Sequence, residues 1–462
     1  MKIRGYGVVA LLVLSACRPH QSTKVAQAAG VQAERPPAEG ELERSAMQLD
    51  LDFWLATLTE VHPDPYTKIE RSRFLAEFAA AREALPEHAD ALYFYATLQR
   101  LAARLQDSHT RVHHPESSRA YNDAWWPIQV AVRDGRLFVE RTERGLVRGT
   151  ELLSVNQWSA ARLLQGGAAL SNAETSTAAQ HDAPWAFSVV LWEAGIRGPF
   201  SVRGRLPSGA TVSALVEGIV PYEAEAEAEA ESEDFSLSWP EHDVALLTLR
   251  AMTDVDGFAS FVESAVEQLA AKHARALIVD LRENSGGNTE VGERLLERVT
   301  AKPYTMVGEK HWRVSKQYQA RAHYQEYLDA KPGTTLHFRW KAEAPSVVSA
   351  RYDGPVCFLI GPNTVSSAMM LANAVEDFDL GLLIGEPTSS PPNYFGEVYR
   401  FDLPRTKLRA QSSVARFVRA NGNADDPNPV QPDIRVSATL EQWARGDDAV
   451  LARALEWSRS GK

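Results

Sequence analysis

The part of the chain that follows Trp239 alternates short apolar runs with longer segments of helical periodicity. The strand-like runs occupy residues 243–250, 276–284, 355–361, 381–388 and 396–404, and the helix-like runs occupy 257–273, 289–301 and 367–377. This alternation predicts a layered α/β domain with a largely parallel sheet. Ligands of such sheets bind in the crevice beyond the carboxyl ends of the strands.

Two of these strands are followed by residues that can carry chemistry. Asn284-Ser285-Gly286-Gly287 follows one, and paired glycines let backbone N–H groups point freely into a cleft. Thr364-Val365-Ser366-Ser367 lies between the next strand and a helix. On local grounds these hydroxyls favour a helix N-cap, and the alternative is a nucleophile at the positive end of the helix. If both loops open on one crevice, a glycine N–H and the Ser367 N–H would form an oxyanion hole.

The chain begins with a short targeting segment. A basic stretch with Lys2 and Arg4 precedes an apolar run from about Val8 to Leu14, which is too short to span a bilayer. It ends in Leu-Ser-Ala-Cys17, which resembles the bacterial lipobox. That resemblance implies a lipoprotein signal peptide, a lipid anchor on Cys17 and a bacterial cell-envelope location. An ordinary secretory signal with an incidental cysteine is the alternative.

Composition divides the mature chain into further parts. A polar, Pro- and Ala-rich stretch is typical of a tether, helical periodicity predicts a helical domain, and short alternating runs with Asp-Gly and Ser-Gly turns predict a β-rich module. An acidic repeat, EAEAEAEAESED, is typical of a solvated linker. The expected boundaries are 1–16 for the signal peptide, 17–46 for the tether, 47–120 for the helical domain, 121–222 for the module, 223–238 for the linker, 239–440 for the α/β domain and 441–462 for a C-terminal helix.

The charge and the cysteine and histidine residues limit which partners and cofactors we expect. The net charge of -11 argues against nucleic acid as a partner, because phosphate binding needs basic surface. Cys357 lies in an apolar strand and is expected to be a small buried hydrophobe. His109, His113 and His114 have a spacing that a metal site could use, but no HExxH pattern accompanies them. We therefore expect no metal and no organic cofactor.

Four segments occur in an order that resembles a known enzyme family. LIVDLRENSGG, NTVSSAMMLANAVEDF, LIGEPT and VQPDIRV resemble the tail-specific (C-terminal processing) serine peptidases, whose relatives include the tricorn core protease and the interphotoreceptor retinoid-binding protein. The similarity runs from about Gln48 to Val436. It implies an α/β multi-domain fold with a crotonase-like catalytic core, an N-terminal helical domain and a PDZ-like module at 121–222.

The resemblance also implies roles for the glycine and serine loops. Ser366 matches the nucleophile, and Ser367 with Gly286 or Gly287 matches the oxyanion donors. The tail-specific branch takes its base from a lysine at about Pro391. This chain has no lysine between Lys341 and Lys407, so the Ser/Lys dyad is absent.

The tricorn-like branch instead takes a histidine that follows a serine. LQDSHTRV fits that pattern with Ser108 and His109, and histidine is suited to general-base work near neutral pH. An acid must then orient the base, and we favour Glu397 narrowly. The alternatives are Asp426, near the place of the tricorn glutamate, and Asp107, adjacent in sequence to His109.

These features together predict a lipid-anchored serine endopeptidase that acts on proteins or peptides through an acyl-enzyme. A catalytically inactive ligand- or peptide-binding protein on the same fold is the first alternative, because fold does not settle function. An esterase or acyl hydrolase is the second.

Overall fold

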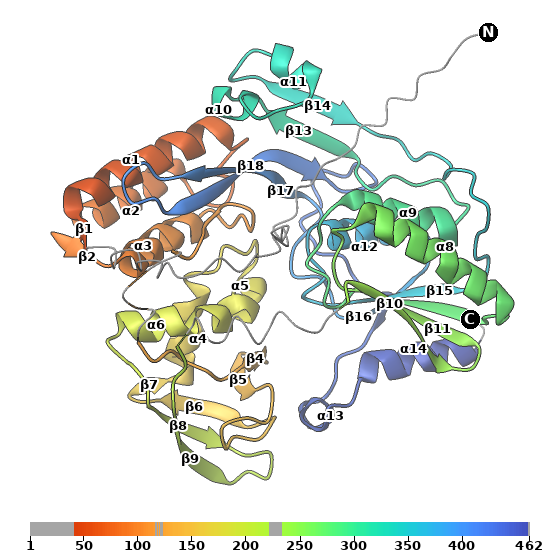
Figure 1. The fold of residues 1–462 in the computed structure, drawn as a ribbon, viewed down its shortest axis with the longest axis horizontal. Coiled ribbons are helices and arrows are strands. Elements are labelled where there is room, and N and C mark those ends of the chain that lie inside the picture. The colour runs from red at the N-terminus through yellow and green to blue at the C-terminus, as the bar shows by residue number, and fades with distance from the viewer. Residues whose placement is uncertain (1–40, 116–117, 119, 121–122, 221–232, 461–462) are drawn as a thin grey trace, which may run out of the picture.

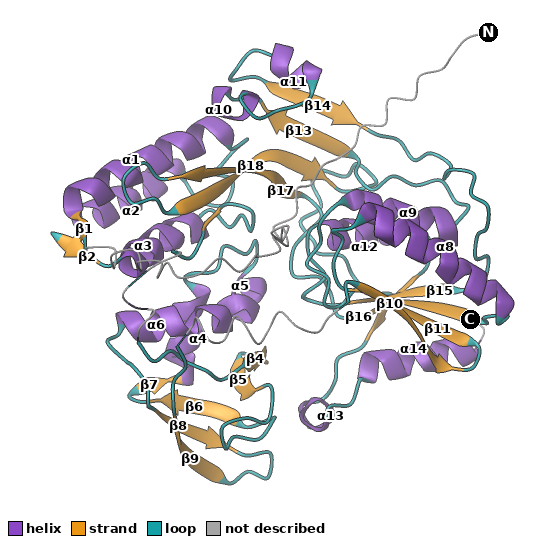
Figure 2. Cartoon of the chain, in the orientation of Figure 1, coloured by secondary structure: helices purple, strands orange, loops and turns teal. Residues whose placement is uncertain are grey.

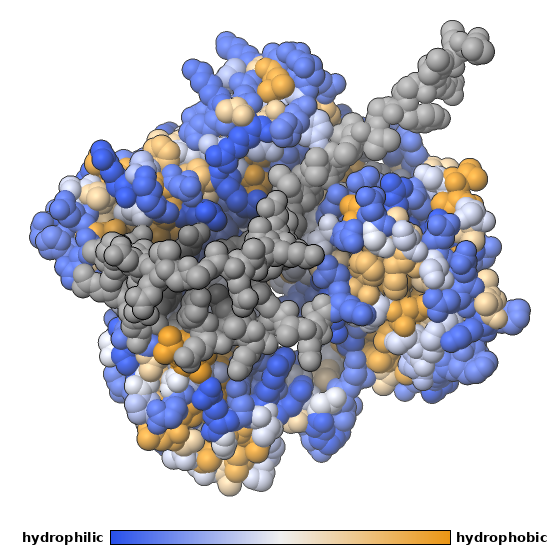
Figure 3. All heavy atoms as spheres, in the orientation of Figure 1, coloured by the Kyte–Doolittle hydropathy of each residue, from blue (hydrophilic) through white to orange (hydrophobic). Residues whose placement is uncertain are grey.

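The computed structural model describes residues 41–115, 118, 120, 123–220 and 233–460. The expected signal peptide with Cys17, most of the tether and most of the acidic repeat lie outside these residues. Within the described ranges, every helix is too short or too polar to cross a bilayer. The face of the molecule seen in Figure 3 is largely hydrophilic, and its apolar side chains gather mainly over the α/β domain.

Three helices form the N-terminal part of the fold. They are α1 (Arg44–Val61), α2 (Arg71–Glu83) and α3 (Ala91–Ala103), and the short strands β1 (Leu42–Glu43), before α1, and β2 (His88–Ala89), before α3, pair antiparallel. Trp54, Phe74 and Phe94 are buried between them. These side chains belong to the same hydrophobic core as the following α/β domain, so the helices are packed onto that domain rather than separate from it.

The module that follows has its own core. Its strands pair in the order β4 (Val130–Arg133), β5 (Arg136–Val139), β6 (Glu151–Val155), β8 (Phe200–Arg205) and β9 (Thr211–Val216), with β7 (Trp158–Ser159) beside β6. The helical elements α4 (Ala160–Ala168), α5 (Ser176–Asp182), η2 (Ala183–Ala186) and α6 (Phe187–Glu193) lie between β7 and β8 in the chain. Asp134 and Gly135 both have positive φ, as the Asp-Gly hairpin signal predicts.

The α/β domain is built on a six-stranded sheet. Its strand order is β10 (Phe235–Glu241), β11 (Val244–Leu249), β12 (Ala276–Asp280), β15 (Val356–Ile360), β16 (Leu382–Gly385) and β19 (Ile434–Arg435), and every pair except β10–β11 is parallel. Helices α8 (Val255–Ala271), α9 (Thr289–Val299) and α12 (Ser367–Phe378) cover one face, and α14 (Ala449–Ser460) covers the other (Figure 1). Cys357 is buried in β15, as expected from the sequence.

The run at 396–404, which we expected among the strands of the α/β domain, belongs to a second sheet (Figure 2). This antiparallel sheet has the order β14 (Thr335–Arg339), β13 (Glu309–Arg313), β18 (Arg409–Val418) and β17 (Tyr394–Asp402). The short helices α10 (Lys316–Gln319) and α11 (Gln325–Asp329) connect β13 to β14, and α13 (Leu440–Arg445) precedes α14. Consecutive strands β17 and β18 form a hairpin, so local pairing prevails over addition to the parallel sheet.

The second sheet also brings a distant segment to the domain. β3 (Arg111–Val112), which directly follows the Ser108–His109 pair, is antiparallel to β18 through Gln411 and Ala410. This pairing joins residues about three hundred positions apart in the sequence, and it delivers the histidine loop to the α/β domain.

Candidate active site

The turn that follows β15 holds Ser366 in an unusual backbone conformation. The Thr364 hydroxyl donates to the Leu281 carbonyl (2.8 Å), and the Val365 N–H donates to the Asn284 carbonyl (3.0 Å), so the turn is fastened to the loop after β12. Ser366 itself has φ 53° and ψ -123°, and its side chain makes no capping bond. A non-glycine residue at positive φ is strained and is held there by its surroundings. Ser366 is therefore not acting as a cap, although it stands at the N-cap position of α12.

His109 faces this serine from the loop before β3. Its Nε2 lies 3.5 Å from the Ser366 Oγ, and its ring centroid is 5.5 Å from that of Tyr394. The separation of the Ser366 Oγ and His109 Nε2 atoms is long for a hydrogen bond, but such bonds in active sites are often long without substrate and tighten when it binds. The structure thus brings together Ser366 and His109, which are 257 positions apart in sequence.

The other ring nitrogen of His109 contacts a serine that is bound by an acid. The Ser108 Oγ lies 3.2 Å from His109 Nδ1, and the same hydroxyl donates to Glu174 Oε1 at 2.6 Å. The second oxygen of Glu174 accepts from the Ser390 hydroxyl, also at 2.6 Å. Because the Ser108 hydroxyl donates its hydrogen to Glu174, it can only accept a hydrogen bond from His109, and the Nδ1 atom therefore carries the hydrogen. The unprotonated Nε2 then faces Ser366, which is the tautomer that a general base requires.

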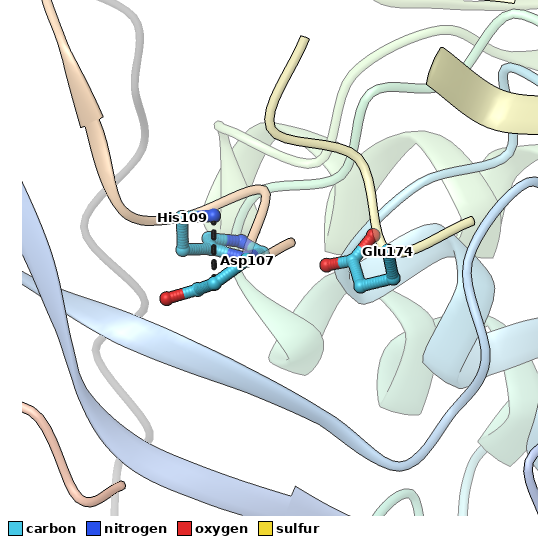
Figure 4. Close-up of side chains that lie close together, drawn as sticks. All are labelled: Asp107, His109 and Glu174. Carbon is cyan, nitrogen blue, oxygen red and sulfur yellow. Dashed lines mark hydrogen bonds between the residues drawn. The ribbon is translucent and has the colours of Figure 1, made fainter. Parts of the chain in front are cut away.

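Asp107 holds the backbone of the loop instead of the ring. Its Oδ1 accepts from the His109 N–H at 3.0 Å (dashed in Figure 4), and its Oδ2 accepts from His62 Nε2 at 3.0 Å and from the Thr110 hydroxyl. Burial would raise the pKa of Asp107, but the hydrogen bonds from His62 and Thr110 outweigh it and hold the pKa below its usual range. The aspartate is therefore ionised and fixes the loop.

Asp107, His109 and Glu174 lie close enough to be considered as metal ligands. One ligand atom from each lies within 4.8 Å of the others (Figure 4). Both carboxylates, however, already accept hydrogen bonds on each oxygen, from His109, His62 and Thr110 for one and from Ser108 and Ser390 for the other. Hydrogen bonding accounts for the cluster without an ion.

The two glycines of the loop after β12 lie directly against the serine turn. A Cβ built on Gly286 would be 2.7 Å from the Ser366 Cβ and 2.9 Å from the Ser367 N atom. The Gly286 N–H already donates to Asn284 Oδ1 at 2.8 Å. The N–H groups of Gly287 and Ser367 have no acceptor among the described residues. Of the two glycines proposed from the sequence, only Gly287 therefore has a free donor for an oxyanion.

The structure does not bring Glu397 to the histidine. Its carboxylate pairs with the buried Lys310 and accepts from the Tyr318 hydroxyl at 3.0 Å. Asp426 is also elsewhere, where it binds Arg419 and the Asn428 side chain. Their places beside His109 are taken by Glu174, which lies in the module between α4 and α5. Nothing in the sequence around Glu174 indicated this, because its partners are 66 and 216 positions away.

The other histidines have separate surroundings. His113 Nε2 lies 2.9 Å from the Gln411 side-chain oxygen, and burial lowers its pKa to about 4. Neither His113 nor His114 belongs to the group of possible metal ligands around His109 among the described residues.

Comparison with known proteins identifies relatives of the α/β domain. Residues 243–436 match the family model for Peptidase family S41. The tail-specific protease of Haemophilus influenzae is 26% identical over 214 residues, which are 44% of this chain and 26% of that protein. The aligned region thus spans about a quarter of that relative. The matched family segment contains the glycine and serine loops but excludes His109 and Glu174.

Solved structures show that the likeness of fold extends over most of the chain. The crystal structure of mature CPAF superposes with a TM-score of 0.63 at 17% identity, covering 89% of this chain and 96% of the other. The structure of mature CPAF complexed with lactacystin gives a TM-score of 0.62 at 17% identity, covering 90% and 98%. The helical part, the module and the α/β domain are therefore arranged as one mixed α/β multi-domain fold similar to that of mature CPAF.

Proposed function

Because residues 243–436 match the family model for Peptidase family S41, we propose that this protein is a serine-type peptidase with Ser366 as its nucleophile and His109 as its general base. The observation that carries the proposal is the strained Ser366 at the N-terminus of α12, with His109 Nε2 3.5 Å from its hydroxyl oxygen. A serine hydroxyl is a weak nucleophile unless a neighbouring base removes its proton. The serine and the base that it needs lie together at this point of the fold.

The proposed reaction proceeds through an acyl-enzyme. His109 takes the Ser366 proton as Oγ attacks the scissile carbonyl, and the imidazolium then donates that proton to the leaving amine. The free N–H groups of Gly287 and Ser367 stabilise the oxyanion of the tetrahedral intermediate, and each such donor is worth about 10²–10³ in kcat. A water activated by His109 then hydrolyses the ester.

The Ser108–Glu174 pair supports the base throughout this cycle. The Glu174 carboxylate accepts hydrogen bonds from the Ser108 and Ser390 hydroxyls, and an acid at this place favours the imidazolium that forms on His109. The Ser108 hydroxyl links the two groups, because it accepts a hydrogen bond from His109 Nδ1 and donates one to the Glu174 carboxylate. It thereby fixes the orientation of the His109 ring. The arrangement replaces a direct histidine–carboxylate contact.

The cellular setting of the proposal comes from the first residues of the chain. The segment that ends in Leu-Ser-Ala-Cys17 resembles a lipobox, which supports a cell-envelope peptidase anchored by lipid at Cys17 and acting on protein or peptide substrates. We further propose that the α/β domain is crotonase-like and that the module of residues 121–222 is PDZ-like. These assignments rest on sequence resemblance.

The proposal is tested by covalent labelling of the full chain in detergent. A fluorophosphonate should label the wild type and fail to label Ser366→Ala. The His109→Ala change should slow labelling and casein hydrolysis by about 10²–10⁴. The exposed Ser437, whose hydroxyl binds Glu386, supplies a matched control, and Ser437→Ala should retain full labelling.

The outcomes separate the competing functions. A wild type that is never labelled and never cleaves casein contradicts a peptidase and favours a binding protein on the same fold. Hydrolysis of small acyl esters without casein cleavage favours an esterase. Loss of labelling in Ser366→Ala but not in His109→Ala keeps the nucleophile and removes His109 as its base.

A further inference from the structure

A loop of the module lies directly against the loop that carries His109. Residues 169–175 connect α4 to α5, and residues 107–110 precede β3. Besides Glu174, this module loop contacts the α/β domain through Thr175, whose hydroxyl donates to the Ser389 carbonyl at 3.3 Å. It is fastened to α3 by Gln99, whose side-chain amide donates to the Leu170 carbonyl at 2.8 Å.

Asn172 makes the largest set of contacts with the histidine loop. Its Nδ2 lies 3.0 Å from the Asp107 carbonyl, 2.9 Å from the Ser108 carbonyl and 3.1 Å from the Thr110 carbonyl. Three acceptors around one nitrogen require the NH₂ group, not the oxygen, to point at the loop. Its two hydrogens are shared among the three carbonyls.

The remaining carbonyl of the loop is held from the opposite side. The Gln411 side-chain amide on β18 donates to the His109 carbonyl at 2.9 Å. Two side-chain amides thus bind all four carbonyls from Asp107 to Thr110, one from the module and one from the second sheet. The Asp107 carbonyl also accepts the Thr110 N–H at 3.0 Å, whereas the carbonyls of Ser108, His109 and Thr110 have these amides as their partners among the described residues.

We propose that Asn172, a residue of the module, is a positioning residue for the base. Among the described residues, the Asn172 side chain donates to carbonyls of residues 107–110 and makes no hydrogen bond with the His109 ring or with Ser366. It acts through the backbone of residues 107–110, which determines where the ring of His109 points. This inference rests on the proposed function, because the position of His109 matters for turnover only if it is the base.

The first test compares two substitutions with a matched control in the full chain. Asn172→Ala removes the donors, and Asn172→Asp sets a carboxylate against three carbonyl oxygens. A misplacement of about 1 Å costs about 10² in rate, so kcat should fall by about that factor in Asn172→Ala, and further in Asn172→Asp. KM should stay within about twofold, since uniform binding is unchanged. Asn156, at positive φ in the turn between β6 and β7, supplies the control as Asn156→Gly, which should retain the wild-type kcat.

A second readout does not depend on turnover. Hydrogen exchange of the amides of residues 107–110 is measured in Ser366→Ala and in the double variant with Asn172→Ala. Faster exchange in this loop, with the thermal midpoint of the whole chain nearly unchanged, supports the inference. Unchanged exchange together with an unchanged kcat overturns it.

The two readouts also distinguish this inference from the proposed function. If the wild type has no hydrolytic activity but the loop exchanges faster in the Asn172 variant, the peptidase proposal fails while the positioning contact stands. If the wild type is active and Asn172→Ala keeps full kcat and an unchanged pH profile, the peptidase proposal stands and the positioning role is wrong.

Discussion

At the scale of single residues, the histidine loop depends on a charge that is fully enclosed by protein. Asp107 is buried, and it binds the buried His62 as well as the His109 N–H and the Thr110 hydroxyl. His62 accepts the Asp64 N–H on Nδ1 at 3.0 Å, so its Nε2 carries the proton that it gives to Asp107. A buried charge is tolerated only when its hydrogen bonds are complete, as they are here.

Asp107→Asn should destabilise the chain by about 1.5–3 kcal/mol at neutral pH, the usual worth of hydrogen bonds to a charged group. The folded pKa of Asp107 is lowered, so its contribution to stability is present above the unfolded pKa and is lost as the pH falls through the folded value. Urea unfolding should therefore show a difference between wild type and variant that shrinks in acid.

Asp52→Asn is the control for that experiment. Asp52 is exposed and pairs with Arg82 on the surface, where such pairs contribute about 0–1 kcal/mol. Its unfolding free energy should stay close to that of the wild type at both pH values. An Asp107→Asn defect of the same size in acid as at neutral pH would show that the ionised carboxylate is not the stabilising species.

At the scale of elements, the junction of β15 with α12 is shaped by its neighbour, the loop after β12. Gly286 has φ 93° and approaches the backbone of the serine turn so closely that a side chain has no space. The helix that follows leaves its first N–H, that of Ser367, without an acceptor among the described residues, and the Ser367 hydroxyl donates to the Gly287 carbonyl at 2.6 Å. Two loops and one helix terminus therefore form a single unit.

Gly286→Ala should lower activity by about 10² or more, because the new Cβ must displace Ser366 from His109. It should also cost about 1–3 kcal/mol of stability. Gly209→Ala is matched, since Gly209 has φ 88° but no atom within 4 Å of the added Cβ. Gly209→Ala should lose only the stability that alanine costs at positive φ. Its rate of fluorophosphonate labelling should equal that of the wild type. Equal losses of activity in the two variants would contradict the steric argument.

At the scale of the whole molecule, the module is held by α3, where Arg100 pairs with Glu193, and through α5, where His181 Nε2 lies 2.7 Å from the Asn363 side-chain oxygen. Two further places hold it as well. One is the loop at 169–175 beside His109. The other is α13, where the Trp443 ring lies between the guanidinium groups of Arg133 (5.2 Å) and Arg148 (4.9 Å) and meets the edge of Phe138 at 6.3 Å. Cation–π contacts and aromatic burial both favour this docking.

Trp443→Ala should weaken the attachment at α13. A buried Trp→Ala change costs about 3–5 kcal/mol of unfolding free energy, and kcat should fall with it because the module also carries Asn172 and Glu174. Thermal unfolding and casein hydrolysis measure the two effects. Trp185→Ala is the control, since Trp185 is 90% exposed, and it should change neither. A stable Trp443 variant with wild-type kcat would show that α13 does not hold the module in place.

Much of the local structure could be predicted from the sequence. The Ser108–His109 pair was singled out only by the resemblance to the tricorn-like branch. The alternation of apolar runs and helical periodicity, in contrast, indicated the strands and helices of the α/β domain, and the turn before α12 and the paired glycines were visible as short patterns. These features depend on residues within a few positions of one another, through side-chain periodicity, capping and turn chemistry.

Other features of the site depend on contacts between distant parts of the chain. Glu397 and Glu174 are the same residue type, yet one is bound by Lys310 and the other by Ser108 and Ser390. Gly286 and Gly287 are adjacent, yet only one has a free N–H, because Asn284 binds the other.

Local sequence by itself therefore determined the strand–turn–helix units and the reactive residue types that they present. Tertiary structure alone decided which acid supports the histidine, which glycine is free to donate, and that the module supplies Asn172. The reason is physical: hydrogen bonding and burial depend on distance in space, and the chain brings residues hundreds of positions apart to within 3 Å only after its helices and sheets have packed.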